Sequence, residues 1–445
     1  MGLSDLNFLF RFLPVFLLLY FLCPIKYRNT VLLGASVIFC ALSSLQGTAV
    51  LLVSITVNYG LLRAMDFNQT SAAWRKGWLA IAVLFQAGLL CYYKYKAGAL
   101  PPGISFYTFA LLSADIDVYR KEERPPKSWM EFGIFTAMFP KLLSGPITQY
   151  RHTIEQVRKR RVTARNIEYG VSQVVLGLAF KVIIADTLGI LWRQIQTIGF
   201  ESISTPFAWM GAAAYSVQLF FDFQGYSLMA VGLGSILGFQ LPQNFDHPYR
   251  ARSISEYYRR WHISLGRWFR DYLYIPLGGS RAGTGRTIFN LLAVWLVTGI
   301  WHGVTLNFLL WGLTLGFFIV MEKLWLGRFL DAHKVFSHLY VWFLIPLTWV
   351  IFAVTDLEGL RIYFTRLFPF QDTGIAVNAK DWIIHGKSYA GFFLAAFAVS
   401  CPAADFIWKK FWNTLAAKVV LFCLFWVCVY RIVNGLHNPF LYLGF

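Results

Sequence analysis

Two histidines are the residues best suited to acid–base chemistry. His302 lies in the apolar stretch LLAVWLVTGIWHGVTLNFLLWGL, and His262 lies in the basic, aromatic stretch RRWHISLGRWFRD. An ionisable side chain inside a membrane span is a functional candidate by default, and a neutral imidazole in a dry pocket is a good general base for a hydroxyl group. The alternative for His302 is a core histidine bonded to a carbonyl, and the residues alone favour neither. For His262 the corresponding alternative, an ordinary interfacial histidine, is stronger.

A carboxylate and two glycines add to this set. Asp222 interrupts the apolar run AYSVQLFFDFQGYS, where a hydrogen-bonded carboxyl that holds helices together is favoured over direct catalysis. Gly299 and Gly303 bracket the histidine of GIWHG, and glycines let a helix break or let another group approach the backbone closely.

The composition indicates which elements must position these residues. Of 445 residues, 57% are hydrophobic and 14% are charged, and the mean hydropathy is +0.53. Soluble domains carry about 25% charged residues. The shortage of charge argues against a soluble enzyme, a disordered tail and a fibrous protein, and it predicts a polytopic membrane protein.

Apolar stretches recur along the whole chain and predict about 10–12 membrane spans. Some are too short to cross alone and are expected to be re-entrant or tilted. The run 31–62 is broken at Gln46–Gly47 and is expected to form two short helices. The other stretches are 8–25, 78–93, 103–118, 130–147, 170–192, 207–240, 288–303, 305–326, 338–355, 389–408 and 415–433.

Positive charge is concentrated in two loops of a chain whose net charge is +18. One loop runs from Arg151 to Arg165, and the other, 250–286, mixes eight arginines with aromatic and aliphatic residues. Such mixing is typical of helices that lie in the headgroup plane, and the alternative is a solvated cytoplasmic loop that only orients the protein. Because anionic lipids attract basic loops, the charge indicates a lipid bilayer rather than nucleic acid as the partner.

Other catalytic patterns are missing from the sequence. It has no GxSxG, HExxH, Walker or dinucleotide-binding motif, and the spacing of its histidines and cysteines offers no metal site. The pair Gly278–Gly279 fits either a tight turn or a nest of amides near a phosphate, and the turn is favoured.

Several motifs occur in one order along the chain. The longest are SISEYYRRWHISLGRWFRDYLYIPLGGSR (253–281) and GIWHG (299–303). Others are LPPGISFYTF (100–109), DVYR (117–120), FP-x-L-x-SGPI (139–147), FDFQGYS (221–227), LPQNFDHPYRA (241–251) and NPFLYLGF (438–445). Together they resemble the membrane-bound O-acyltransferase family, and within it the alginate O-acetyltransferase-like bacterial branch. The chain departs from that pattern at Leu228, where relatives carry an acidic residue, and in 243–250, where ENFN-x-PYR is usual.

The resemblance implies an all-α polytopic membrane fold. About eleven transmembrane helices, with in-plane and re-entrant helices, would form a ring around a central funnel. One integral membrane domain is expected over 1–445. Its parts would be N-terminal spans (8–95), middle spans (100–250), a basic amphipathic cytoplasmic segment (250–286), catalytic spans (288–326) and C-terminal spans (338–445).

The resemblance also implies O-acyl transfer to a hydroxyl group. On this sequence the essential intramembrane histidine is His302, and the second family histidine is His262. Supporting residues are expected at Asp222, Asn244, Trp301 and Gly303. Basic residues that would attract the phosphates of coenzyme A or an acidic carrier protein are Arg259, Arg260, Arg267 and Arg270.

No tightly bound cofactor is expected, because the acyl thioester, acetyl-CoA or an acyl carrier protein, is a co-substrate. It would arrive from the cytoplasm, at the inner membrane of a bacterial cell. In relatives the acetyl group continues to an exported polysaccharide, so an extracytoplasmic SGNH-type acetyltransferase and polysaccharide machinery are the expected partners.

Three alternatives remain open. Within the family, D-alanyl transfer to teichoic acids is disfavoured because IPLGGSR follows WHISL here, as it does in alginate-type members. A transporter or channel is disfavoured because the sequence shows no internal repeat. A catalytically inactive scaffold of a secretion complex is the third.

Overall fold

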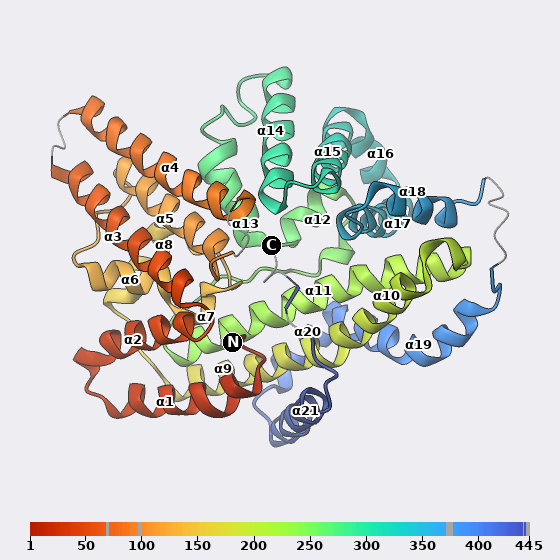
Figure 1. Ribbon diagram of the computed structural model, residues 1–445, viewed down its shortest axis with the longest axis horizontal. Coiled ribbons are helices and arrows are strands. Elements are labelled where there is room, and N and C mark those ends of the chain that lie inside the picture. Colours follow the sequence, from red (N-terminus) through yellow and green to blue (C-terminus); the bar gives the residue numbers. More distant parts are fainter. Residues whose placement is uncertain (68–70, 97–99, 371–376, 439, 442–445) are drawn as a thin grey trace. The chain divides into compact units, whose positions relative to one another are not determined.

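The structure is a computed structural model that describes every residue except 68–70, 97–99, 371–376, 439 and 442–445 (Figure 1). Regular structure in the described residues is helical, and extended backbone pairs there only in one antiparallel bridge between Phe245 and Trp261. The predicted all-α fold is therefore confirmed.

Seven helices in the described part of the chain are long and apolar enough to cross a membrane. They are Leu45–Phe67, Ala72–Tyr95, Ala164–Ile198, Leu306–Ala332, Lys334–Ala353, Asp381–Ser400 and Leu415–Val433, and a shorter apolar helix covers Phe8–Leu22. Many of their large apolar side chains are exposed, as contact with lipid tails requires. The chain is a multi-pass membrane protein. The total of about eleven spans and their ring around a funnel stay predictions.

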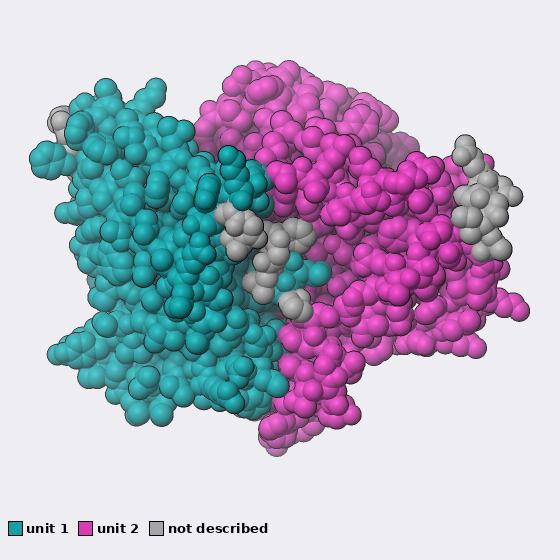
Figure 2. Space-filling model, in the orientation of Figure 1, with its two compact units in different colours: residues 1–178, 226–243, 439–444 teal, residues 179–225, 244–438, 445 magenta. Residues whose placement is uncertain are grey.

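The chain divides into two compact units, coloured separately in Figure 2. Unit 1 comprises Met1–Leu178, Tyr226–Gln243 and Pro439–Gly444. It includes most of α9 (Ala164–Ala179) and the end of α11 (Thr205–Ile236). Its other elements are η1 (Phe8–Phe12), α1 (Leu13–Leu22), η2 (Ile25–Tyr27), α2 (Arg28–Ala41), α3 (Leu45–Phe67), α4 (Ala72–Tyr95), α5 (Ile104–Tyr119), α6 (Trp129–Ala137), α7 (Phe139–Leu142) and α8 (Tyr150–Arg158).

The apolar run 31–62 forms two helices, but the predicted position of the break is wrong. α2 ends at Ala41 and α3 begins at Leu45, so Gln46–Gly47 lies inside the second helix. Ser44 starts that helix, because its Oγ accepts the Gly47 N–H at 2.9 Å. The glycine serves packing, since a Cβ there would lie 2.5 Å from Cδ of Pro102.

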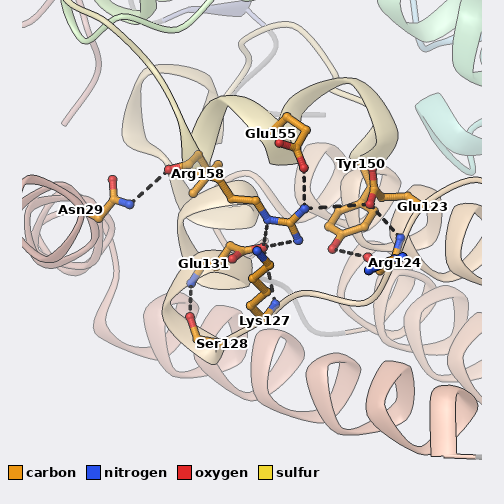
Figure 3. A network of polar contacts seen from close by, with 10 residues as sticks. Asn29, Glu123, Arg124, Lys127, Ser128, Glu131, Tyr150, Glu155 and Arg158 are labelled. Carbon is orange, nitrogen blue, oxygen red and sulfur yellow. Dashed lines mark hydrogen bonds and ion pairs between the residues drawn. The ribbon is translucent and has the colours of Figure 1, made fainter. Parts of the chain in front are cut away.

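Arg158, the first residue of the basic cluster Arg158–Arg161, joins three parts of unit 1 (Figure 3). The Arg158 guanidinium lies 2.7 Å from a carboxylate oxygen of Glu131 in α6 and 2.6 Å from one of Glu155 in α8. A third carboxylate, Glu123 in the loop before α6, lies 3.9 Å away. Arg158 is therefore the centre of an internal ion-pair network.

Arg160 also makes hydrogen bonds within unit 1. Its Nε donates to the carbonyl of Leu237 at 3.1 Å, and its guanidinium donates to the hydroxyl of Tyr20 at 3.0 Å. The same group lies over the ring of Phe239, 4.4 Å from the centroid. The other two members of the cluster, Lys159 and Arg161, are exposed.

We predict that Arg158→Ala destabilises the protein by about 1.5–3 kcal/mol, because it removes charged hydrogen bonds from the largely buried carboxylate of Glu131. Lys159→Ala, the matched exposed control, should change stability by no more than about 0.5 kcal/mol. Thermal unfolding of the two variants in detergent checks this. Equal shifts would contradict the structural role of Arg158.

Unit 2 comprises Ala179–Gly225, Asn244–Asn438 and Phe445. It contains the first part of α11 and the remaining elements. These are η3 (Phe180–Ala185), α10 (Asp186–Ile198), η4 (Phe200–Ser202), η5 (Pro248–Arg250), α12 (Ile254–Arg260), α13 (Ile263–Phe269), η6 (Arg270–Tyr274), α14 (Thr284–His302), α15 (Leu306–Met321), η7 (Glu322–Leu326), α16 (Gly327–Ala332), α17 (Lys334–Ala353), α18 (Leu357–Leu367), α19 (Asp381–Ser400), α20 (Pro402–Phe411) and α21 (Leu415–Val433).

The basic segment 250–286 forms the short helices α12, α13 and η6, followed by a turn. Gly278 and Gly279 have φ of +110° and +57°, which favour glycine. Their N–H groups donate to the carbonyls of Ile275 and Tyr274, both at 3.0 Å. Because these amides are already bonded within the chain, the pair forms a tight turn, the favoured interpretation. The position of the segment in the membrane plane stays a prediction.

Candidate active site

His302 is the last residue of α14 and is only 5% exposed. Its ring lies edge-on to Trp311, with centroids 5.0 Å apart, and edge-on to Phe352 at 5.1 Å. Phe308 lies nearly parallel to it at 6.3 Å. The imidazole is therefore held in an apolar, aromatic environment, where electrostatic interactions are stronger than in water.

Two glycines create this environment by close packing of α14 against α15. A Cβ on Gly299 would lie 2.7 Å from the carbonyl oxygen of Phe308, and one on Gly303 would collide with the ring of the same phenylalanine. Gly303 also follows the last residue of α14. Trp301, beside the histidine, is buried. The geometry gives Gly303 a packing role next to His302, and its effect on catalysis stays a prediction.

A chain of tryptophans joins the two histidine segments inside unit 2. Trp311, which contacts His302, stacks on Trp349 with ring centroids 5.7 Å apart. Trp349 in turn contacts Trp261 at 5.0 Å. Trp261 directly precedes His262 in the sequence. Three ring contacts thus connect His302 with the residue next to His262, although the convergence of both rings on one cavity stays a prediction.

His262 is buried and has an unusual backbone conformation. It is 4% exposed, and its φ of +46° lies in the left-handed region that non-glycine residues seldom occupy. Its ring meets Phe223 edge-on at 4.6 Å. Among the described residues, neither ring nitrogen has a hydrogen-bond partner. Backbone strain and unsatisfied buried polar atoms are both concentrated at functional sites.

Asn244 positions the residues that follow His262. Its Oδ1 accepts the N–H of Ser264 at 3.3 Å and the hydroxyl of Ser264 at 2.6 Å. Its carbonyl accepts the N–H of Ile263 at 2.9 Å. One buried residue therefore binds the first two amides of α13. Asn244 is therefore placed to orient the backbone that follows His262, and its supporting role in catalysis stays a prediction.

Burial lowers the pKa of His262 from its ordinary value of 6.5 to about 3. The folded protein keeps this ring neutral, whereas the unfolded chain takes up a proton below about pH 6.5. We therefore predict that stability falls as the pH drops from 6.5 towards 3 and that His262→Gln weakens this dependence. Melting temperatures in detergent at pH 7 and pH 5 check this. The control His338→Gln should keep the wild-type loss, and equal losses in all three proteins would contradict the prediction.

Two of the four arginines predicted to bind the donor are engaged within the protein. Arg260 lies 2.9 Å from Asp246 and 3.0 Å from Glu256, and it bonds the backbone of Asp246 as well. Arg270 lies 2.7 Å from Asp271. These ion pairs hold the basic segment together and leave less charge for a ligand.

The other two arginines, Arg259 and Arg267, are exposed. Within the part of the chain that the structure describes, neither makes an ion pair or a side-chain hydrogen bond. They are the better candidates for binding the anionic part of a donor, and donor binding by all four arginines stays a prediction.

Asp222 belongs to a buried ion network. Nζ of Lys181 lies 2.6 Å from Oδ1 of Asp222 and 2.6 Å from Oδ1 of Asp186. Nδ1 of His437 lies 2.8 Å from Oδ2 of Asp186. The lysine and both aspartates have side chains no more than 2% exposed. A buried cation between two carboxylates fits the structural role that the sequence favours for Asp222.

Lys181 and Glu322 are absent from the residues singled out in the sequence. Lys181 lies inside the apolar run 170–192, so the rule that selects Asp222, an ionisable residue in a span, selects it equally. Glu322 lies near the end of the run 305–326, and its carboxylate accepts hydrogen bonds from α12. The same rule selects Glu322, but no motif indicates its contact with α12.

Comparison with known proteins places this geometry in a family. The family model of MBOAT, the membrane-bound O-acyltransferase family, matches residues 119–395. The chain is 34% identical to the probable alginate O-acetylase AlgI of Pseudomonas putida, over 100% of both chains. It is 31% identical to the peptidoglycan O-acetyltransferase of Helicobacter pylori, over 79% of this chain and 77% of the relative. It is also 32% identical to the teichoic acid D-alanyltransferase of Lacticaseibacillus rhamnosus, over 53% of this chain and 61% of the relative.

The matched region includes both histidines, the basic segment and most of unit 2. The similarity to the two O-acetylating relatives extends over more than three quarters of the chain, whereas that to the D-alanyltransferase covers about half. The chain therefore belongs to the membrane-bound O-acyltransferase family and is an O-acyltransferase, as the motifs predicted.

Proposed function

We propose that this protein takes an acetyl group from a cytoplasmic thioester and passes it on for O-acetylation of an exported cell-surface polysaccharide, in the inner membrane of a bacterium. The observation that carries the proposal is the placement of His302, enclosed by aromatic rings at the end of α14. The relatives named for alginate and peptidoglycan support a polysaccharide as the final acceptor.

The proposed reaction uses His302 as the general base. It removes the proton from an acceptor hydroxyl, and the oxygen attacks the thioester carbonyl. The tetrahedral intermediate collapses, the C–S bond breaks, and the protonated imidazole returns its proton to the thiolate that leaves. His262 would orient the donor or stabilise the oxyanion. The products are the acylated acceptor and the free thiol.

The donor would be acetyl-CoA or an acyl carrier protein, attracted by the basic segment 250–286. Entry of the acceptor from the opposite side would let acyl groups cross the bilayer without the whole donor. An SGNH-type acetyltransferase and polysaccharide machinery outside the cytoplasm would then complete the modification.

The experiment that tests the proposal uses purified protein in liposomes, supplied with a radiolabelled acyl donor and a hydroxyl acceptor. Label should pass from acetyl-CoA or an acetylated carrier protein to the acceptor. Transfer from D-alanyl carrier protein alone would favour the teichoic acid alternative. Uptake of solute without any acylation would favour a transporter.

The basic segment allows a separate prediction. Arg259→Ala and Arg267→Ala should each raise the donor KM up to about fivefold with little change in kcat, because exposed ion pairs contribute at most about 1 kcal/mol. The effect should shrink at high salt, which screens exposed charges. Arg361→Ala, an exposed arginine on α18, serves as the control. A wild-type donor KM in the double variant would exclude these two residues from donor binding.

A further inference from the structure

The helix that leads into His262 is held at its start by a carboxylate from another helix. Oε1 of Glu322 accepts the N–H of Ile254 at 2.6 Å, and Oε2 accepts the N–H of Ser255 at 2.9 Å. The Ser255 hydroxyl donates to Oε2 at 2.5 Å, and the Tyr340 hydroxyl donates to Oε1 at 3.1 Å. Four donors therefore converge on a side chain that is 8% exposed.

These bonds supply most of the capping of α12. The first amides of a helix have no partner inside it and must find one elsewhere. Ser253, the residue before α12, caps only one of them, since its Oγ accepts the N–H of Glu256 at 3.0 Å. The first two amides, those of Ile254 and Ser255, bind Glu322. The start of α12 is thus placed by a residue remote in sequence.

The same arrangement recurs on the other side of His262. There the first two amides of α13 bind Asn244. α12 and α13 have seven residues each, and helices this short are not stable alone. The backbone on both sides of the strained His262 therefore depends on two remote acceptors, Glu322 and Asn244.

Glu322 is also tied to the environment of His302. It begins η7, a π-helical turn inside the continuous helix Leu306–Ala332. An earlier part of that helix, α15, carries Trp311 against the His302 ring. One helix therefore packs on one histidine and anchors the segment of the other, and π-helical turns are frequent at functional sites.

We propose that Glu322 is a positioning residue for acyl transfer, whose carboxylate sets the place of α12 and hence of His262 relative to His302. The inference rests on the proposed function for its effect on rate. All four contacts to Glu322 come from donors, so an amide in its place would turn an N–H₂ group towards at least one of them. A side chain of the same shape is therefore not enough: only a carboxylate can accept all four hydrogen bonds.

The first test compares Glu322→Gln and Glu322→Asp in the liposome assay. Glu322→Gln should lower kcat by about 10²-fold, the effect of an ångström-scale misplacement, with a smaller change in donor KM. Glu322→Asp, which keeps both oxygens, should recover at least about tenfold of that loss. Glu358→Gln, the same change on an exposed glutamate of α18, is the matched control and should keep the wild-type kcat. A kcat within twofold of wild type in Glu322→Gln would overturn the proposal, as would the absence of recovery in Glu322→Asp.

The second test is hydrogen exchange, which does not depend on activity. In Glu322→Gln the amides of 254–256 should exchange faster, while those of α14 keep their wild-type rates. Unchanged exchange at 254–256 would overturn the contact itself. If the wild-type protein transfers no acyl group, the proposed function fails, and the exchange result still decides whether Glu322 holds α12.

A third pair of variants keeps the proposal testable if Glu322→Gln does not fold. Tyr340→Phe and Ser255→Ala each remove one hydroxyl donor to the carboxylate and leave Glu322 in place. Each should reduce kcat several-fold and speed exchange at 254–256. Wild-type kcat and exchange in both variants would overturn the proposal.

Discussion

Replacing His302 with alanine should lower the rate of acyl transfer by about 10²–10⁴-fold, the usual contribution of a general base. The imidazole is the ionisable group that the aromatic rings of Trp311, Phe308 and Phe352 enclose. Loss of the base should act on kcat rather than on donor KM, because the basic segment that attracts the donor is untouched.

The measurement is transfer of label from the acyl donor to a hydroxyl acceptor in liposomes. His302→Gln, which keeps more of the side-chain volume, should be as inactive as His302→Ala, and this separates chemistry from packing. His338→Ala on α17 is the control and should remain active. Full transfer by His302→Ala would discard the mechanism. Intact polysaccharide modification in cells that carry His302→Ala would favour a role as an inactive scaffold.

Replacing Lys181 with methionine should destabilise the protein by about 3–5 kcal/mol, the largest stability effect we expect. The substitution leaves two buried carboxylates, Asp186 and Asp222, without the ammonium that lies 2.6 Å from each. Nδ1 of His437 would still lie 2.8 Å from Oδ2 of Asp186. Removing one member of a buried ion network is strongly destabilising, because the remaining charges stay buried without full compensation.

The matched variant Asp222→Asn separates this effect from a general loss of packing. It keeps the Lys181–Asp186 pair and should cost only about 1–3 kcal/mol. Thermal unfolding in detergent gives both values. A Lys181→Met protein as stable as Asp222→Asn would contradict the predicted extra cost of removing the ammonium from between the two carboxylates.

The sequence predicted the class of the fold because the affinity of a segment for lipid depends on the residues of that segment alone. Long apolar runs must become helices in a bilayer, where every backbone polar group needs an internal partner. The predicted helix boundary at Gln46–Gly47 was wrong, because Gly47 does not mark a helix end. Its lack of a side chain leaves room for the ring of Pro102, which packs against it. The basic cluster Arg158–Arg161 likewise looked uniform along the chain, yet two of its arginines bind inside unit 1.

The candidate site was predictable where one residue stood out against its neighbours. His302 is an isolated imidazole in an apolar span, and His262 is marked by the long WHISL motif. The partners of these residues were not predictable. Lys181 meets Asp222 across about forty residues of sequence, and nothing local indicates that pairing.

The amino-acid sequence by itself determined that this chain is a helical membrane acyltransferase, and it singled out His302 and His262 as the candidates for the chemistry. Only the tertiary structure decided which charges are neutralised inside the protein and which stay available. It alone showed that α12 is capped by Glu322. The reason is physical: solubility in lipid follows from the residues of one segment, whereas a hydrogen bond or an ion pair forms only between atoms that folding brings within about 3 Å.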